Sequence, residues 1–267
     1  MTTIARLDGR TVLVAGAGTQ PSDDPDAPIG NGRAIAVLAA RAGALVVCAD
    51  RDRSAAEETA ALIEREGGDA TVVVGDVTSA DDCTAIVTCA SEAAGEARGG
   101  PGRPLDGVVV NVGIGRGAGM AGTTPEDWDA TMAVNLRGHF LVARAALEAM
   151  GEGGAIVFIG SVAGLQPGSR LPAYDASKAG LIGLARHVAL EGARRGVRAN
   201  VVAPGLIDTP LGRLATRGRP SRARTPVPLG RQGTAWEVGA VVVFLLSDEA
   251  SYVTGQVLAV DGGLSLI

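Results

Sequence analysis

The sequence predicts an α/β protein whose core is one doubly wound parallel sheet with helices on both faces. Short apolar runs rich in Val, Ile and Ala recur along the chain, and several end at Gly, Asp, Asn or Pro, as buried parallel strands do. Between most of these runs lie longer stretches with the spacing of amphipathic helices. Strand and helix alternate through the 267 residues without a repeat or linker, so we expect a single domain over residues 1–267.

Seven strands and six helices are expected. The apolar runs predict strands at 11–15, 44–49, 70–75, 105–110, 155–159, 197–203 and 256–260. Helical patterns begin after residue 32 and then cover 53–66, 79–95, 125–150, 174–195 and 234–247. Residues 206–233 have little periodicity and many Arg, Pro and Gly, so we interpret them as a mobile substrate-binding loop.

Composition favours an enzyme-sized globular core over a nucleic-acid or membrane protein. Hydrophobic residues make up 46% of the chain and aromatic residues only 3%, so the core must be aliphatic. The net charge is −5 with acids and bases interspersed, which argues against a nucleic-acid surface. The basic patch in the 206–233 loop is interpreted first as a solvated loop face and second as a contact for an acidic ligand; its members are Arg213, Arg217, Arg219, Arg222 and Arg224.

Targeting signals and cysteines point to the cytoplasm. The N-terminus lacks the apolar core of a signal peptide, and the apolar run 240–246 is too short to span a bilayer, so we expect no membrane association. Cys48, Cys83 and Cys89 form no CxxC pair and no metal-binding spacing. An odd, sparse set of cysteines is typical of buried thiols in a reducing compartment, and we predict no metal site.

A glycine-rich turn at the first strand–helix junction is the first candidate binding element. The strand 11–15 leads into Gly16-Ala17-Gly18, and Gly30-Asn31-Gly32 opens the first helix. Glycines let the backbone approach a pyrophosphate, and a helix N-terminus favours its charge. The polar stretch 19–28, with three Asp and three Pro, interrupts this motif. We expect it to be an inserted surface loop, a possible flap beside the phosphates, whose acidity disfavours an additional phosphate on the cofactor.

Acidic residues end the next two strands. Asp50 is placed to bind both ribose hydroxyls of a dinucleotide and to repel a 2′-phosphate, with helix capping as the alternative. Arg51 favours the opposite cofactor, because an Arg at this point can accept a 2′-phosphate. Asp76 and Val77 follow the third strand, where an acid can meet an adenine amino group.

The stretch 161–178 carries the candidate catalytic chemistry. Ser161 follows a buried strand, and Tyr174 and Lys178 are four residues apart on one face of a helix. A close ammonium favours the phenolate form of a tyrosine, which otherwise loses its proton near pH ~10. The alternative is an ordinary helix start with an exposed Tyr and Lys. Asn135 lies among apolar residues, so its amide needs partners: it is either a satisfied core Asn or a polar relay behind Lys178.

In this order the motifs resemble the short-chain dehydrogenase/reductase family over nearly the whole chain. The resemblance rests on the glycine turn, Asn135, Ser161, Tyr174-x-x-x-Lys178, and the strand ends Asn111-Val112-Gly113, Pro204-Gly205 and Asp261-Gly262-Gly263. It implies a Rossmann-type sheet in the order 3-2-1-4-5-6-7 and a homotetramer built through the long helices. The chain departs from the family pattern in the 19–28 stretch and in Asn-Val-Gly, one residue shorter than the usual Asn-Asn-Ala-Gly.

The resemblance also implies a role for each motif. Tyr174 would be the general acid/base, Ser161 would orient the substrate oxygen, Lys178 would bind the nicotinamide ribose, and Asn135 would hold a water. The remaining cofactor contacts would come from Gly16, Gly18, Gly30, Asn31 and Gly32 at the pyrophosphate, Asp50, Arg51, Asp76 and Val77 at the adenosine, and Asn111 and Gly113 along the cofactor. Thr209 would hold the carboxamide, and Pro204, Gly205 and Ile207 would be further cofactor contacts.

The expected activity is reversible hydride transfer between NAD(H) and a secondary alcohol or ketone. An NADP-preferring carbonyl reductase is the first alternative, and a non-catalytic dinucleotide-binding protein is the second. The substrate itself carries no pattern in the sequence.

Overall fold

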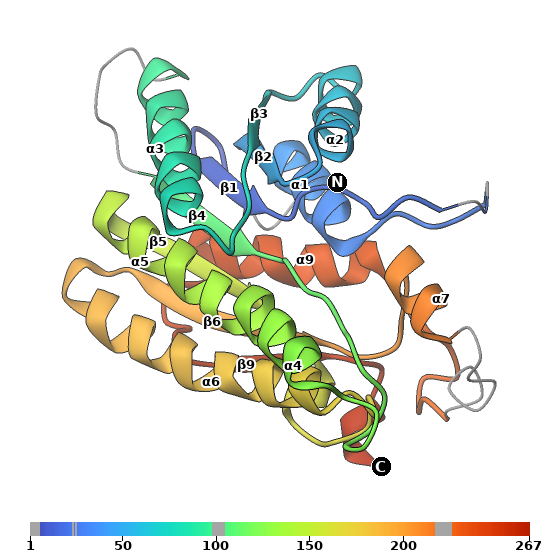
Figure 1. The fold of residues 1–267 in the computed structure, drawn as a ribbon. Coiled ribbons are helices and arrows are strands. Elements are labelled where there is room, and N and C mark those ends of the chain that lie inside the picture. Colours follow the sequence, from blue (N-terminus) through green and yellow to red (C-terminus); the bar gives the residue numbers. More distant parts are fainter. Residues whose placement is uncertain (1–5, 23, 25, 98–104, 217–225) are drawn as a thin grey trace.

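The computed structural model describes residues 6–22, 24, 26–97, 105–216 and 226–267. Its main sheet has seven parallel strands in the order β3-β2-β1-β4-β5-β6-β9 (Figure 1). The predicted order is confirmed, with β9 as the seventh strand. The strands are β1 Thr11–Ala15, β2 Leu45–Asp50, β3 Ala70–Val74, β4 Leu105–Val110, β5 Met150–Ile159, β6 Arg198–Pro204 and β9 Val257–Val260.

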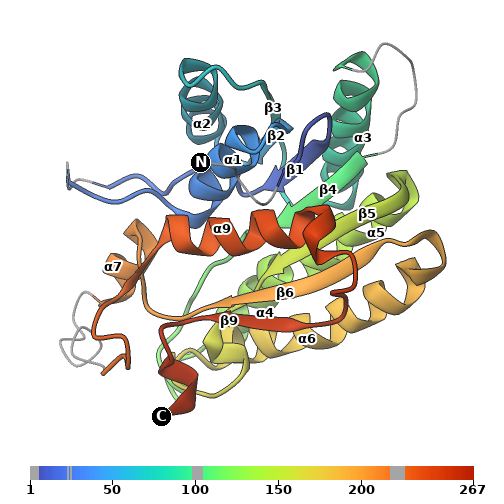
Figure 2. The same cartoon turned by 180° about the vertical axis from the view of Figure 1, so that it is seen from behind.

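Helices cover both faces of this sheet, as Figures 1 and 2 show from opposite sides. They are α1 Asn31–Arg41, α2 Arg53–Arg65, α3 Ala80–Ala97, α4 Pro125–Met132, α5 His139–Ala149, α6 Pro172–Gly192, α7 Pro210–Thr216 and α9 Ala235–Leu246. The side chains of β1 show why two layers form: Val12 and Val14 pack with residues of α1, α2 and α9, whereas Leu13 and Ala15 pack with residues of α3, α5 and α6.

The helix expected over 125–150 is divided into three parts. A π-helical turn, Ala133–Gly138, separates α4 from α5. Asn135 lies within this turn, and its side chain is bonded to the main chain of Ile114. The extra residue per turn is typical of π-bulges, which are frequent at functional sites. The predicted helix end is one residue too late, since α5 ends at Ala149, and β5 begins at Met150 rather than at residue 155.

The segment 206–233, interpreted from the sequence as a mobile substrate-binding loop, contains regular secondary structure among its described residues. A second, two-stranded sheet pairs β7, Ile207–Asp208, with β8, Gly233–Thr234, and α7 lies between them in the chain. The Thr209 side chain accepts from Gly212 N at 3.0 Å and so starts α7. A seven-residue helix is too short to produce a visible period. Of the five predicted patch arginines, Arg213 lies in α7 and the other four fall outside the described residues.

Two of the three cysteines are buried as expected. Burial raises the pKa of the Cys48 thiol to about 12 and that of Cys83 to about 11. Cys89 is exposed on α3, so the prediction of a buried thiol is wrong there. No group of three or more His, Cys, Asp or Glu side chains able to hold a metal occurs within the described residues. Across the same residues, no helix is long and apolar enough to cross a membrane.

Candidate active site

The glycine turn brings the end of β1 against the start of α1. Gly16 has a φ of 84°, a conformation that L side chains rarely adopt. A Cβ added to Gly32 would lie 1.8 Å from the Gly16 carbonyl oxygen, so only glycine allows this approach. The Asn111 side chain, at the end of β4, donates to that same carbonyl at 2.8 Å. Three predicted cofactor residues therefore meet at one point on the carboxyl edge of the sheet.

The N-terminus of α1 fits an anionic, hydroxyl-bearing ligand. Gly30 is the N-cap residue, and no side chain caps the helix there. Unpaired N–H groups at a helix N-terminus form an anion site, and the macrodipole adds to it. The Asn31 Oδ1 atom is buried without a hydrogen-bond partner. This orphaned acceptor can receive a ligand hydroxyl, while the N–H groups at the start of α1 suit a phosphate.

We call the stretch 19–28 the acidic loop. It interrupts the glycine motif in sequence, but hydrogen bonds hold the two parts of the motif together. Gly30 N donates to Thr19 Oγ1 at 3.0 Å, which joins the two ends of the loop. Gly18 N donates to Asp50 Oδ2 at 3.0 Å, which ties the turn to the end of β2. The acidic loop therefore leaves the two halves of the glycine motif next to each other.

Asp50 is not a helix cap. The N-cap of α2 is Asp52, whose side chain accepts from Ser54 N and Ala55 N. The Asp50 carboxylate instead faces the glycine turn through Gly18 N and also accepts from Asp52 N at 3.1 Å. The alternative of a capping role is therefore wrong. Arg51 is exposed beside it.

The β3–α3 turn carries Asp76 and Val77 to the same edge. Asp76 Oδ1 accepts from both the amide and the hydroxyl of Thr78 at 2.8 Å. Val77 is buried, and a Cβ added to Gly138 would lie 2.9 Å from its side chain. The π-helical turn therefore packs against Val77 at this part of the sheet edge.

Asn135 is fully buried and its side chain is fully engaged. Its amide donates to the Ile114 carbonyl at 2.8 Å and to Ser177 Oγ at 3.2 Å, and its Oδ1 accepts from Ile114 N at 2.8 Å. These contacts fix the loop after β4 against α6. Gly113 lies next to both Lys178 and Asn135: a Cβ added there would be 3.5 Å from Lys178 Nζ and 3.8 Å from Asn135 Oδ1.

Lys178 joins α6 to the end of β5, with the Tyr174 ring on one side and Ser161 two residues beyond the strand. Ser161 follows the end of β5, and its Oγ accepts from Ala163 N at 3.1 Å. Lys178 Nζ donates to the Ile159 carbonyl at 2.9 Å and lies 5.7 Å from the centroid of the Tyr174 ring. Burial lowers the pKa of Lys178 to about 7. The ordinary-helix alternative fails for Lys178, which is only 3% exposed.

The strand end after β6 completes the edge. Gly205 is packed so closely that an added Cβ would lie 2.6 Å from the Asp261 side chain, and Pro204 ends β6. Ile207 and Thr209 are buried next to it. Thr209 uses its hydroxyl to start α7, a role that the sequence did not predict.

Two functional candidates were missed from the sequence, and Arg213, which was expected to be a solvated loop residue or a ligand contact, has a different role. Ser177 is buried and links Asn135 to the Tyr174 carbonyl, to which its Oγ donates at 2.8 Å. His139 is completely buried; burial first and the Lys178 charge second lower its pKa well below the usual 6.5. Arg213 bonds the acidic loop to α7. The position of Ser177 inside the Tyr174–Lys178 motif was a sequence signal for its role. The roles of His139 and Arg213 depend on tertiary contacts, which the sequence does not show.

Known proteins are similar to this chain in sequence over most of its length. The family model described as Enoyl-(Acyl carrier protein) reductase matches residues 28–265. The 2-(S)-hydroxypropyl-CoM dehydrogenase 3 of Xanthobacter autotrophicus is 38% identical over 98% of this chain and 99% of its own. From the same organism, a protein named inactive 2-(S)-hydroxypropyl-CoM dehydrogenase 2 is 41% identical over 87% of this chain and all of its own.

Solved structures agree with the fold. A putative short-chain dehydrogenase/reductase from Burkholderia xenovorans has a TM-score of 0.87 at 35% identity, covering 98% of this chain and 99% of its own. A putative 2-deoxy-d-gluconate 3-dehydrogenase from Agrobacterium tumefaciens, with bound NADP, has a TM-score of 0.82 at 34% identity and covers 98% of each chain. The strand order, the glycine cradle and these relatives lead to one conclusion: the chain belongs to the short-chain dehydrogenase/reductase family of oxidoreductases.

Proposed function

We propose that this protein catalyses reversible hydride transfer between NAD(H) and a secondary alcohol or ketone. The observation that carries the proposal is the position of buried Lys178. It lies beside the Tyr174 ring and bonds the end of β5, two residues before Ser161, at the sheet edge that also holds the glycine cradle. Relatives in the family are oxidoreductases named for hydroxy or oxo substrates. The substrate beyond that group is not specified by any described contact.

Tyr174 would move the substrate proton. In oxidation its phenolate accepts the hydroxyl proton, and in reduction its hydroxyl returns it, which is worth about 10²–10⁴-fold in rate. Ser161 Oγ would share the substrate oxygen and stabilise developing charge. The nicotinamide ring, when bound, supplies the hydride acceptor or donor. A protonated Lys178 beside the ring stabilises the phenolate and would bind the nicotinamide ribose.

Asn135 would act through its main chain. Both amide hydrogens and the Oδ1 atom already have protein partners, so the side chain positions Ile114 and Ser177. The π-helical turn alters the regular bonding of the helix around Asn135, and a carbonyl released in such a turn can hold a water. The water-holding role predicted for Asn135 is therefore assigned to its carbonyl.

The choice of cofactor rests on Asp50 and Arg51. Asp50 faces the glycine turn, where its charge favours ribose hydroxyls over a 2′-phosphate. Arg51 is exposed at the same corner and favours NADP, and a related structure holds NADP. We propose NAD as the cofactor with an NADP-preferring reductase as the alternative. Asp50→Ala should reduce the preference for NADH over NADPH in equilibrium binding; an unchanged ratio would assign the choice elsewhere.

Tyr174→Phe tests the proposed chemistry. Turnover with NAD or NADP and a panel of secondary alcohols should fall by at least ~10²-fold, while dinucleotide binding changes little. Tyr252→Phe is the matched control, because the only other tyrosine is fully exposed. Dinucleotide binding without turnover of any alcohol or ketone by the parent would favour the non-catalytic alternative, for which the inactive relative is a precedent.

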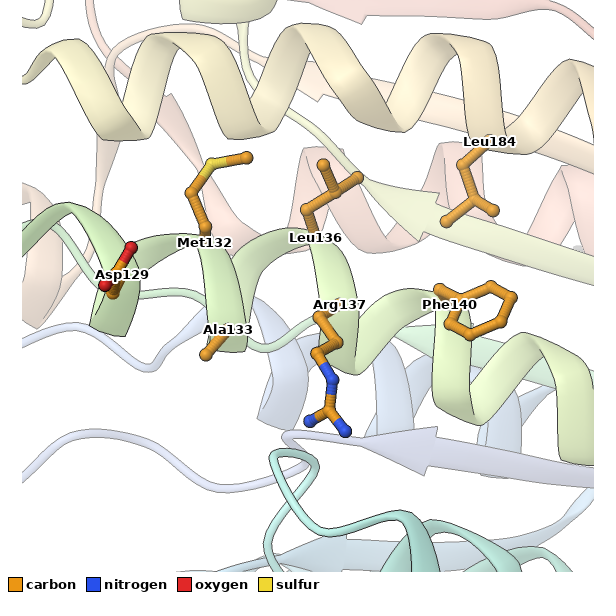
Figure 3. A pocket seen from close by; sticks show the side chains of 7 residues that line it. All are labelled: Asp129, Met132, Ala133, Leu136, Arg137, Phe140 and Leu184. Carbon is orange, nitrogen blue, oxygen red and sulfur yellow. The ribbon is translucent and has the colours of Figure 1, made fainter.

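We also propose that the long helices associate as a homotetramer. An apolar groove lies along α4, the π-helical turn and α6, and Figure 3 shows Met132 and Leu136 pointing toward α6 with Leu184 above Phe140. Phe140 is 45% exposed and Trp128 is 39% exposed, which is typical of an interface between copies. Phe140→Glu should lower the mass measured by light scattering, and a monomeric parent would refute the proposal.

A further inference from the structure

The acidic loop is bonded to the element that follows β6, far from it in the chain. Arg213 Nη1 donates to Asp24 Oδ2 at 2.6 Å and lies 3.4 Å from the Asp26 carbonyl oxygen. The same guanidinium donates two hydrogen bonds to Asp208, from Nε to Oδ1 at 2.7 Å and from Nη2 to Oδ2 at 2.9 Å. Arg213 therefore joins the acidic loop to β7 and α7 through one planar fork.

Both ends of this junction are held in place. Within the acidic loop, Asp26 N donates to Asp24 Oδ1 at 3.0 Å and Ala27 N donates to the Asp24 carbonyl at 3.0 Å, so Asp24 sits in a defined turn. On the other side, Arg213 N donates to the Thr209 carbonyl at 2.8 Å, within the first turn of α7. Asp24 and Arg213 therefore each make further hydrogen bonds within their own segment.

The junction spans the proposed cofactor site. The acidic loop leaves from the glycine turn after β1, whereas α7 follows β6, and β4 and β5 lie between these two strands in the sheet. Three strand spacings correspond to about 14 Å. Both views show the acidic loop and α7 on the same side of the molecule (Figures 1 and 2). The chain therefore links the pyrophosphate end of the site to the nicotinamide end, where Thr209 lies.

From this geometry we propose that the acidic loop is a strap that retains the cofactor, with the Asp24–Arg213 ion pair as its fastening. The proposal rests on the dinucleotide site of the proposed function. A dinucleotide bound along the sheet edge leaves only after the strap opens, so the ion pair sets part of the barrier to release. Arg213 is occupied by two carboxylates of this chain, which also removes it from the list of contacts for an anionic substrate.

The test is the release rate of NADH and of NADPH, followed by stopped-flow fluorescence on displacement with excess unlabelled dinucleotide. Asp24→Asn removes the charge at the tip and leaves the Arg213–Asp208 fork intact. Because both partners are about 40% exposed, the expected increase in release rate is modest, about two- to fivefold. Raising the salt concentration should speed release from the parent more than from Asp24→Asn, since only the parent has the pair to screen.

Glu66→Gln is the matched control. Glu66 forms a partly exposed ion pair, with two bonds, to Arg41 at the other end of α1, away from the sheet edge, and its removal should not change release. Equal release rates and equal salt dependence in the parent and Asp24→Asn would overturn the strap while leaving the proposed function intact. Failure of the parent to bind either dinucleotide would overturn both.

Discussion

Replacing Lys178 by Met should make the unliganded protein more stable at neutral pH while removing its activity. Lys178 is the only lysine in the chain, and it is buried with one hydrogen bond, to the Ile159 carbonyl. Burial lowers its pKa from 10.5 to about 7. The unfolded chain therefore binds a proton at this side chain between pH 7 and 10.5, where the folded protein does not, and stability contributed by this group rises with pH across that window.

The size of the effect follows from the same values. Each pH unit between the two pKa values corresponds to about 1.4 kcal/mol, so burying Lys178 costs about 4 kcal/mol at pH 7 and nothing above pH 10.5. Met removes that cost but leaves the Ile159 carbonyl without its donor, which costs about 1–3 kcal/mol. We expect Lys178→Met to be stabilised by roughly 2 kcal/mol at pH 7 and destabilised by a similar amount near pH 10.5.

Urea unfolding of the parent and the variant at several pH values measures this difference directly. A Met variant that is less stable at pH 7, or a stability difference that does not change sign with pH, would refute the reasoning. A second measurement is independent of unfolding: protein labelled with ¹³C at the lysine ε-carbon should give a single side-chain signal, because the chain has one lysine. That signal should titrate near pH 7 without cofactor.

Three further predictions concern other parts of the fold. Gly32→Ala should abolish dinucleotide binding measured by calorimetry, because its Cβ would overlap the Gly16 carbonyl oxygen. Gly183 on α6 has open space around it, so Gly183→Ala should instead raise the free energy of unfolding by about 0.5–1 kcal/mol. Arg198→Met should lower the free energy of unfolding by about 2–4 kcal/mol, since the buried guanidinium bonds the carbonyls of Leu245 and Ser247; exposed Arg194→Met should change it by less than about 0.5 kcal/mol. The folded pKa of His139 lies below 6.5, so the free energy of unfolding should fall as the pH drops below 6.5. In acid unfolding curves, His139→Leu should remove much of that loss. The control His187→Gln should leave it unchanged.

The sheet was predictable because each strand leaves a strong local pattern. β1 and β4 have the predicted bounds, and the bounds of most other strands differ by one residue. A continuous aliphatic run bounded by polar residues marks a buried strand whatever its detailed packing. The candidate site was predicted from the same fact. Parallel strands bring their carboxyl ends to one edge, so residues just after strands, such as Asn111 and Ser161, were expected along that edge.

The predictions failed where tertiary contacts decide the structure. Asn135 interrupts a helix because its amide bonds to Ile114, twenty-one residues away, and no helical period reports such a bond. The start of α7 depends on one hydroxyl, that of Thr209, in a segment without periodicity. Cys89 is on the outer face of α3, and the general tendency of free thiols to be buried does not decide a single helical position.

The bond between Gly30 N and Thr19 Oγ1 has a consequence for how this chain can vary. Since the two ends of the excursion are already joined, its length is decoupled from the geometry of the turn beneath it. Doubling the number of residues between two fixed ends costs only about 0.6 kcal/mol in chain entropy. This junction is therefore a place where sequence can be grafted, shortened or exchanged between relatives while the nucleotide cradle keeps its shape.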